Sequence, residues 1–274
     1  MRPRVLVLAV LLAGCASGGD AGVPTAPAVS TSPPPTDFPA TLSPRPVVLI
    51  GDLLQVVDGL RGEDTVDGLR GPLDFTGRHP VTPARAPVDL PDGARVDLAL
   101  IGSSDALRTM SHPTGTAPPA TTPPATAPKL VGVEFGAAEF PTDRGPWTLP
   151  AWRFTTSAGT VLAWPAVEPD VFWKPGEVRP AVSVEQASAA DQEVAVSMPA
   201  APSPCPGDAP ARNEPVVQET GGTVTVGVRT VGHVGDCART LAVTNQPYRV
   251  PLAAPLGGRL LLDEHGGVIA VTKR

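Results

Sequence analysis

The chain has 274 residues and a formal net charge of −6, and lysine occurs only at Lys129, Lys174 and Lys273. Because there is no run of basic residues, the composition argues against nucleic-acid binding. Proline and glycine, with 36 and 28 residues, make up over a fifth of the chain, and the length suits one large or two small domains.

The N-terminal end has the pattern of an export signal. Arg2 and Arg4 precede an apolar run, Val5–Leu12, which is too short to span a bilayer as a helix. The Leu-Ala-Gly-Cys sequence that ends at Cys15 resembles the bacterial lipobox. This resemblance implies that a diacylglycerol is attached to the Cys15 sulfur and that the chain is cleaved before it. The alternative is an ordinary secretory signal followed by an incidental cysteine.

We therefore expect residues 1–14 to be a signal peptide and Cys15 to hold the protein on the extracytoplasmic face of the cell membrane. Residues 15–46 are expected to be the lipidated cysteine and a disordered tether, because this Pro-rich stretch cannot bury enough apolar surface to offset ordering entropy. A second Pro/Thr/Ala-rich tract, within residues 113–129, is expected to be an interdomain linker or a long loop. The flanking ranges 47–112 and 130–274 are expected to be a small β-rich domain and a larger β domain.

The first of these domains contains signals for three elements. Val47–Ile50 is an apolar run that predicts a strand. Residues 86–90 and 94–98 flank a Pro-Asp-Gly turn and predict a hairpin. Ser103–Arg108 has the pattern of a short capped helix.

A six-residue sequence, Val-Asp-Gly-Leu-Arg-Gly, occurs twice, at residues 57–62 and 66–71. Two copies are too few for a solenoid, which needs about three, and they lack the pattern of calcium-binding repeats. We interpret both copies as Asp-Gly turns with exposed arginines.

Period-two alternation of apolar residues dominates the second domain and predicts further strands. They are expected at Leu130–Phe135, Trp152–Thr155 and Val161–Trp164, with hairpins formed by 216–219 and 223–229 and by 259–263 and 268–271. No long segment has helical periodicity. The expected fold class is mainly β, with two small domains of antiparallel, sandwich-like hairpins and at most one or two short helices.

Two cysteines remain after Cys15, at Cys205 and Cys237. A pair in an exported chain predicts a disulfide. The alternative is a metal or redox pair, but the spacing is not C-x-x-C and His233 is the only nearby histidine.

Two segments resemble a known group of proteins. Thr142–Phe154 reads T-D-R-G-P-W-T-L-P-A-W-R-F, and an Arg-Thr pair at Arg239 leads to Ala254–Asp263, A-P-L-G-G-R-L-L-L-D. Both are similar to segments of uncharacterised exported proteins and lipoproteins of actinobacterial type, and the resemblance covers roughly residues 130–274. Those relatives also have a cysteine pair upstream of the ending, and some have further cysteines before the Pro-Ala-Trp segment that are absent here. The resemblance implies a role in the envelope and supplies no catalytic residue.

No catalytic, metal or cofactor site is predicted. The histidines His79, His112, His233 and His265 are scattered and lack metal-ligand spacing. The chain contains no G-x-S-x-G, H-E-x-x-H or phosphate-binding loop motif.

The tryptophans form the most distinctive cluster. All four fall within 27 residues, at Trp147, Trp152, Trp164 and Trp173. Exposed, they would form a platform for sugar rings, with Arg153 or Asp170 adding hydrogen bonds. Buried, they would form the core of the second domain. The period-two spacing of Trp152 and Phe154 favours the core.

Two functions are consistent with these features. The favoured expectation is a membrane-anchored, non-enzymatic lipoprotein that binds an envelope protein or wall polymer. The alternative is an accessory or hydrolytic enzyme that acts on envelope material. The absence of clustered acid and base residues in the sequence favours binding.

Overall fold

The computed structural model describes residues 37–90, 95–111, 127–182, 184, 186–239 and 242–273. The expected signal peptide, Cys15, His112, the Pro-Asp-Gly turn and most of the second Pro-rich tract lie outside these residues. Strands account for 44% of the structure and helices for 8%, which confirms the mainly β class and the small helical content. The described residues belong to one compact unit, Ser32–Arg274.

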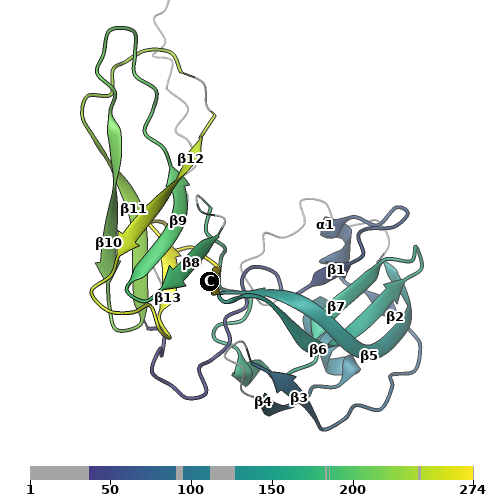
Figure 1. Cartoon of the computed structure of the whole chain (residues 1–274). Helices are drawn as coiled ribbons and strands as arrows, with labels where there is room; N and C mark the ends of the chain where they lie inside the picture. The colour runs from purple at the N-terminus through teal and green to yellow at the C-terminus, as the bar shows by residue number, and fades with distance from the viewer. Residues whose placement is uncertain are drawn as a thin grey trace, which may run out of the picture. The chain divides into compact units, whose positions relative to one another are not determined.

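A five-stranded sheet has the order β1-β7-β6-β5-β2. Its centre is a long antiparallel hairpin of β5 (Lys129–Thr142) and β6 (Gly145–Thr156), which curves in Figure 1. The other strands are β1 (Gln55–Val57), β2 (Asp74–Phe75) and β7 (Val161–Pro165).

This sheet does not respect the expected boundary at residues 113–129. Gln55 of β1 lies opposite Ala163 of β7, and Asp74 of β2 lies opposite Lys129 of β5. Strands from both expected domains therefore share one sheet and one hydrophobic core. Strands of two or three residues bury too little surface by themselves, so their partners are decided by tertiary packing that local sequence does not encode.

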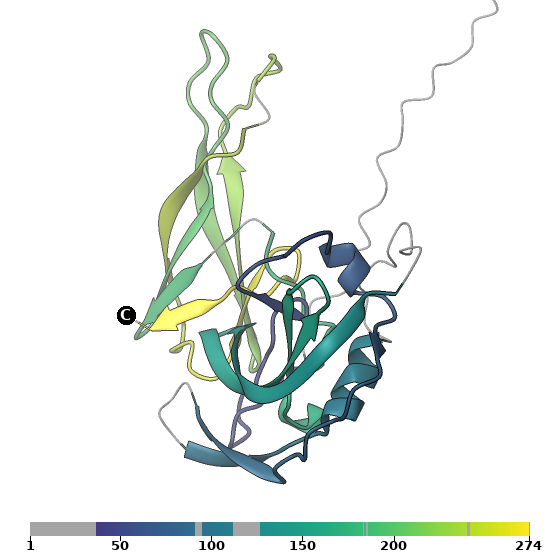
Figure 2. The ribbon, with the colours of Figure 1, turned by 90° about the vertical axis from the view of Figure 1, so that its right-hand side faces the viewer.

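The remaining elements of this part follow the sequence closely. The expected hairpin consists of β3 (Arg85–Asp89) and β4 (Arg95–Ala99). The expected helix is α2 (Ser103–Ser111), which buries Ala106 and Met110. This part of the chain also contains a single-turn helix, α1 (Val66–Leu69), and a 3-10 turn, η1 (Pro169–Val171). Figure 2 shows α2 running alongside the sheet.

The C-terminal strands form two sheets that pack face to face. The first sheet has the order β10-β11-β13 and contains β10 (Arg212–Glu219), β11 (Thr223–Val231) and β13 (Leu260–Asp263). The second sheet has the order β12-β9-β8-β14 and contains β12 (Asn245–Pro251), β9 (Glu193–Pro199), β8 (Ala187–Ala190) and β14 (Val271–Lys273). Buried valines of β9 and β11, Val194 and Val226 among them, belong to one core cluster. This arrangement is a sandwich, as expected.

The expected hairpin at the C-terminus forms only close to its turn. Leu262 and Val268 form an antiparallel bridge, and the N–H groups of Asp263 and Ile269 donate to the carbonyls of Gly267 and Leu261. Beyond this short pairing, β13 pairs in parallel with β11 and β14 pairs in parallel with β8, so the two strands belong to different sheets. Asp263 accounts for the turn between them, because its carboxylate accepts hydrogen bonds from the backbone N–H groups of His265 and Gly267.

The expected strand at residues 47–50 lies between two cores. Val47 and Leu49 pack in the core of the five-stranded sheet, whereas Val48 and Ile50 pack with Leu260, Leu262 and Val268. Burial on both faces explains why this segment is continuously apolar rather than alternating. Its pairing is limited to single bridges, one of them between Leu49 and Thr142.

Residues 38–46 contact the folded part, so the expected tether does not extend to residue 46. Phe38 is 4% exposed and meets the Trp173 ring edge-on at 5.1 Å. The guanidinium of Arg45 lies 4.6 Å from the centre of the Phe38 ring. Phe38 and Arg45 thus attach this Pro-rich stretch to the folded part.

Candidate functional site

The tryptophans belong mainly to the core. Trp152 is fully buried, and Trp147 and Trp164 are 6% and 7% exposed. The indole N–H of Trp147 donates to the Asp89 carbonyl at 2.7 Å, and that of Trp152 donates to the Ile101 carbonyl at 2.9 Å. These hydrogen bonds satisfy the polar edge of each ring, as buried tryptophans require, and burial leaves little ring surface for stacking on a sugar.

The residues expected to assist a sugar platform do not gather around it. Trp173 is only partly buried, but its ring is covered by Phe38, and the Lys174 ammonium lies 4.9 Å from its centre. Arg153 forms an ion pair with Glu134 at 3.4 Å across β5 and β6. Asp170 lies in the η1 turn. The aromatic cluster therefore does not form one open surface.

The three histidines that the structure describes contact different residues. His233 lies 3.9 Å from Asp208, and His265 lies 3.7 Å from Glu264. His79 Nδ1 lies 2.8 Å from the Ser103 hydroxyl, a pair that sequence spacing did not indicate. Ser103 is 1% exposed at the start of α2, so this hydroxyl is buried. Within the described ranges, no group of three metal-ligating side chains occurs.

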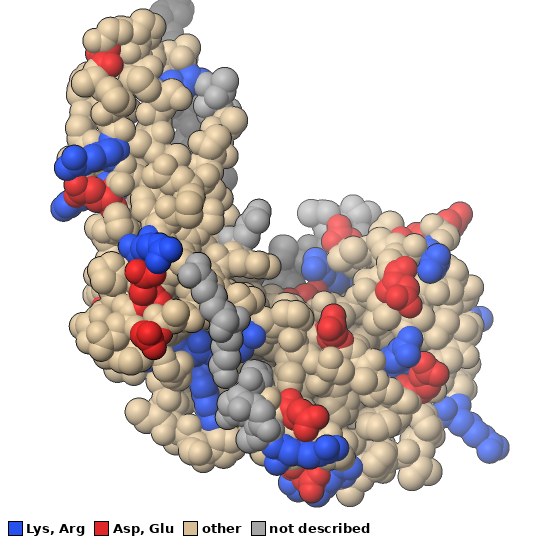
Figure 3. Space-filling view, viewed as in Figure 1, with Lys and Arg blue, Asp and Glu red and all other residues tan. Residues whose placement is uncertain are grey.

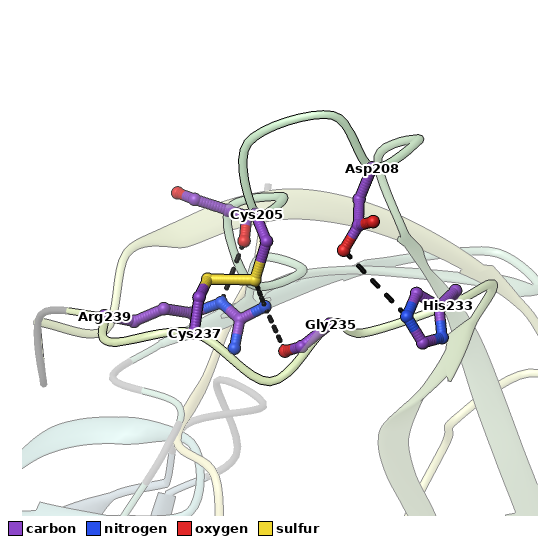
Figure 4. The surroundings of a disulfide bond; sticks show 7 residues. Cys205, Asp208, His233, Gly235, Cys237 and Arg239 are labelled. Carbon is purple, nitrogen blue, oxygen red and sulfur yellow. Dashed lines mark hydrogen bonds and ion pairs between the residues drawn. A yellow bond between two sulfur atoms is a disulfide. The ribbon is translucent and has the colours of Figure 1, made fainter.

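The two cysteines form a disulfide that joins two loops of the sandwich (Figure 4). Cys205 lies between β9 and β10 and Cys237 lies between β11 and β12, with their sulfurs bonded at 2.00 Å. Arg239 reinforces the link, because its guanidinium donates to the carbonyls of Ser203 and Gly235. The guanidinium also contacts the Cys205 sulfur at 3.0 Å. Gly235 has no room for a side chain, since a Cβ there would lie 2.0 Å from an Asp208 carboxylate oxygen.

We expect replacement of both Cys205 and Cys237 by serine to lower the free energy of unfolding by about 2–3 kcal/mol. A loop of this length is worth about 3–4 kcal/mol on the chain-entropy model, but Arg239 still joins the two loops. Urea denaturation of the variant measures the loss, and peptide mass spectrometry without reduction checks the bond. Free thiols at both positions in protein purified without reductant would contradict the assignment.

The two segments that carry the family resemblance meet in the structure. Arg144, in the turn between β5 and β6, donates to the backbone carbonyls of Gly257 and Arg259 at 2.8 and 2.9 Å. Arg45 donates to the carbonyl of Gly258 at 2.7 Å. Arg259 itself donates to the carbonyls of residues 254, 255 and 256. Three arginines thus satisfy six consecutive carbonyls, residues 254–259, in a loop that forms no strand.

Two carboxylates balance this positive charge. Asp143, with its side chain only 3% exposed, accepts two hydrogen bonds from Arg45 and lies 3.4 Å from Arg144 Nε. Glu219 pairs with Arg259 at 2.7 Å. Burial lowers the pKa of the Arg144 guanidinium from its ordinary value, opposed by Asp143 and reinforced by the nearby charge of Arg45. We call Arg45, Asp143, Arg144, Glu219 and Arg259 the arginine junction. Its geometry is that of a structural connection.

A groove of about 450 Å³ lies beside this junction. Its walls come from residues 50 and 55, from the end of the β5–β6 hairpin, from the segment before β8 and from the C-terminal segment that includes part of β14. Most lining residues are apolar. They are Ile50, Gln55, Glu139, Phe140, Pro141, Thr142, Gly145, Pro146, Pro180, Ala181, Val182, Val184, Gln186, Val268, Ala270 and Thr272. A groove of this size falls within the usual range for small-molecule sites, about 300–1,000 Å³.

Polar groups in the groove are few. Among the lining residues that the structure describes, Glu139 is the one with a titratable side chain. The hydroxyl of Thr142 donates to the Gly145 carbonyl, and that of Thr272 donates to the Ala187 carbonyl. The side chains of Glu139 and Gln186 have no hydrogen-bond or ion-pair partner in the part of the chain that the structure describes. Sequence reasoning missed this groove because its walls come from four separate stretches of the chain, between residues 50 and 272.

The face of the molecule drawn in Figure 3 has no large patch of one charge. Figure 3 shows basic and acidic side chains interspersed on the face it presents.

No family model matches the chain, and no curated protein or solved structure is significantly similar to it. None of the helices described is both long enough and apolar enough to cross a bilayer.

Proposed function

We propose that the protein is a membrane-anchored lipoprotein of the cell envelope that acts as a non-enzymatic binding module, with the groove as its binding surface. The observation that carries the proposal is the groove itself. It combines apolar walls of small-molecule size with the carboxylate of Glu139, the one titratable group among its described lining residues. Binding needs apolar area and a few polar groups that fix orientation, and the described lining residues supply both.

The anchoring part of the proposal rests on the sequence that ends at Cys15. A lipid-modified cysteine with two acyl chains would give stable membrane attachment, at about 0.8 kcal/mol per buried methylene. The partners that such a position offers are envelope proteins and wall polymer.

Replacement of Thr272 by phenylalanine tests the groove. The Thr272 side chain is exposed and lines the groove, so a larger side chain there should obstruct binding without disturbing the core. We expect residues 16–274 to co-sediment with isolated envelope material or peptidoglycan and the Thr272→Phe variant to lose this. Thr230→Phe, on β11 outside the groove, is the control. Equal capture of both variants and the parent protein would exclude the groove as the binding surface.

A second candidate function is that of an envelope hydrolase. The one observation in its favour is the contact between Ser103 and His79. A serine next to a histidine is the arrangement of a nucleophile and its base, but Ser103 is 1% exposed. A screen with ester and peptide substrates separates the two candidates. Turnover that disappears in Ser103→Ala would favour the hydrolase.

We expect Cys15→Ala to release the protein from membranes or to leave it as an uncleaved precursor. The change removes the thiol that would accept the lipid. Membrane fractionation and mass spectrometry of the expressed protein measure both outcomes. A correctly sized mature form that still partitions with membranes would contradict the lipobox assignment.

A further inference from the structure

We propose that the groove takes an amphiphile with an aliphatic body and a cationic end group, and that Glu139 selects the charge. This inference rests on the proposed function, because it names the ligand class of the same groove. An extended apolar chain matches the valine, isoleucine and proline side chains of the walls. Burial of each methylene group of such a ligand is favourable by the hydrophobic effect.

The charge preference follows from Glu139. Its carboxylate lines the groove without an ion-pair partner among the described residues. The other acidic residue of β5, Glu134, forms an ion pair with Arg153, so its charge is neutralised. An unpaired carboxylate beside an apolar groove attracts a cationic head group and repels an anionic one.

Gln186 adds an amide group, which can both donate and accept hydrogen bonds. Its amide lines the groove and has no hydrogen-bond partner within the described part of the chain. Because an amide both donates and accepts, it discriminates little between head groups. Glu139 is therefore the residue that should decide which amphiphile binds.

Three eight-carbon probes of nearly equal shape test the inference: octylamine, octanol and octanoate. We expect residues 16–274 to bind them in that order, with octylamine about tenfold tighter than octanoate at low salt. An exposed ion pair is worth about 0.2–1 kcal/mol, so attraction and repulsion should each contribute roughly threefold. The preference should shrink as salt is raised, because Glu139 is exposed to solvent. Isothermal titration calorimetry measures the affinities.

Variants then assign the effect. Glu139→Gln should weaken octylamine about threefold and leave octanol unchanged, as expected for removal of one exposed charge. Glu134→Gln, the matched change on the same strand, should leave the order of the probes intact. Thr272→Phe should weaken all three probes.

The outcomes separate the ligand class from the binding function. Equal affinity for the three probes, or a charge preference that survives in Glu139→Gln, would overturn the cationic amphiphile while leaving the groove as a binding surface. If none of the probes binds, this inference is wrong, and envelope capture that Thr272→Phe abolishes would still support the proposed function.

Discussion

Trp152→Ala is expected to lower the free energy of unfolding by about 3–5 kcal/mol, the usual cost of removing a large aromatic side chain from a core. The Trp152 side chain is fully buried, and its ring meets Phe135 at 5.3 Å across the β5–β6 hairpin. The substitution also leaves the Ile101 carbonyl without its indole donor. A domain of ordinary marginal stability would be largely unfolded by this change, which thermal and urea denaturation would reveal.

Two further variants separate the causes of that loss. Trp152→Phe keeps much of the packing and removes the hydrogen bond, so its cost should be smaller. Phe135→Ala removes the partner ring, which is 38% exposed, and should cost less than Trp152→Ala. If Trp152→Ala keeps the parent melting temperature, the tryptophan face is a surface and the core interpretation fails.

The repeated six-residue sequence marks the limit of local prediction. In the first copy, Asp58 and Gly59 adopt φ values of 60° and 82°, as expected of an Asp-Gly turn. In the second copy, Val66–Leu69 is helix α1, because the preceding Thr65 hydroxyl accepts a hydrogen bond from Gly68 N–H. Leu69 is fully buried whereas Leu60 is 44% exposed. Identical residues therefore fold differently according to a capping neighbour and the available core.

Alternation predicted strands well where they pair with neighbours in sequence. The β3–β4 and β10–β11 hairpins occur as expected because local turns bring their strands together. The parallel pairs β11–β13 and β8–β14 join strands far apart in the chain, and alternation carries no information on such partners.

The groove and the arginine junction were beyond sequence reasoning for the same reason. Arg45 and Asp143 are separated by 98 residues, and Arg144 and Gly257 by 113. The resemblance marked both segments of the junction, yet nothing in either segment indicated that they touch. The cysteine pair, by contrast, was predictable because only two cysteines remain after Cys15.

The arginine junction should depend on Asp143 more than on any surface ion pair. The Asp143 side chain is 3% exposed, whereas those of Arg45 and Arg144 are 22% and 19% exposed. Asp143→Ala leaves two neighbouring guanidinium groups without their shared carboxylate. Removal of one partner from a buried pair typically costs about 3–5 kcal/mol, and we expect about 3–4 kcal/mol because both arginines retain some contact with water.

Glu193→Gln provides the matched control for this loss. It breaks the ion pair between Glu193 and Arg249, whose side chains are 40% and 73% exposed. Such surface pairs contribute little, so the change should cost less than about 0.5 kcal/mol. Asp143→Asn, which retains an acceptor oxygen but no charge, should fall between the two variants. Urea denaturation of the three proteins gives the comparison.

Hydrogen exchange distinguishes a lost connection from general destabilisation. Arg45 and Arg144 donate hydrogen bonds to the carbonyls of residues 257–259, and the Asp143 carboxylate neutralises part of their positive charge. Without Asp143, amide protection should fall first in the loop of residues 254–259 and in the β5–β6 turn. Protection in the centres of β9 and β11 should fall only as much as global stability does. An Asp143→Ala protein with parental stability and unchanged exchange in that loop would show that the junction does not join the two segments energetically.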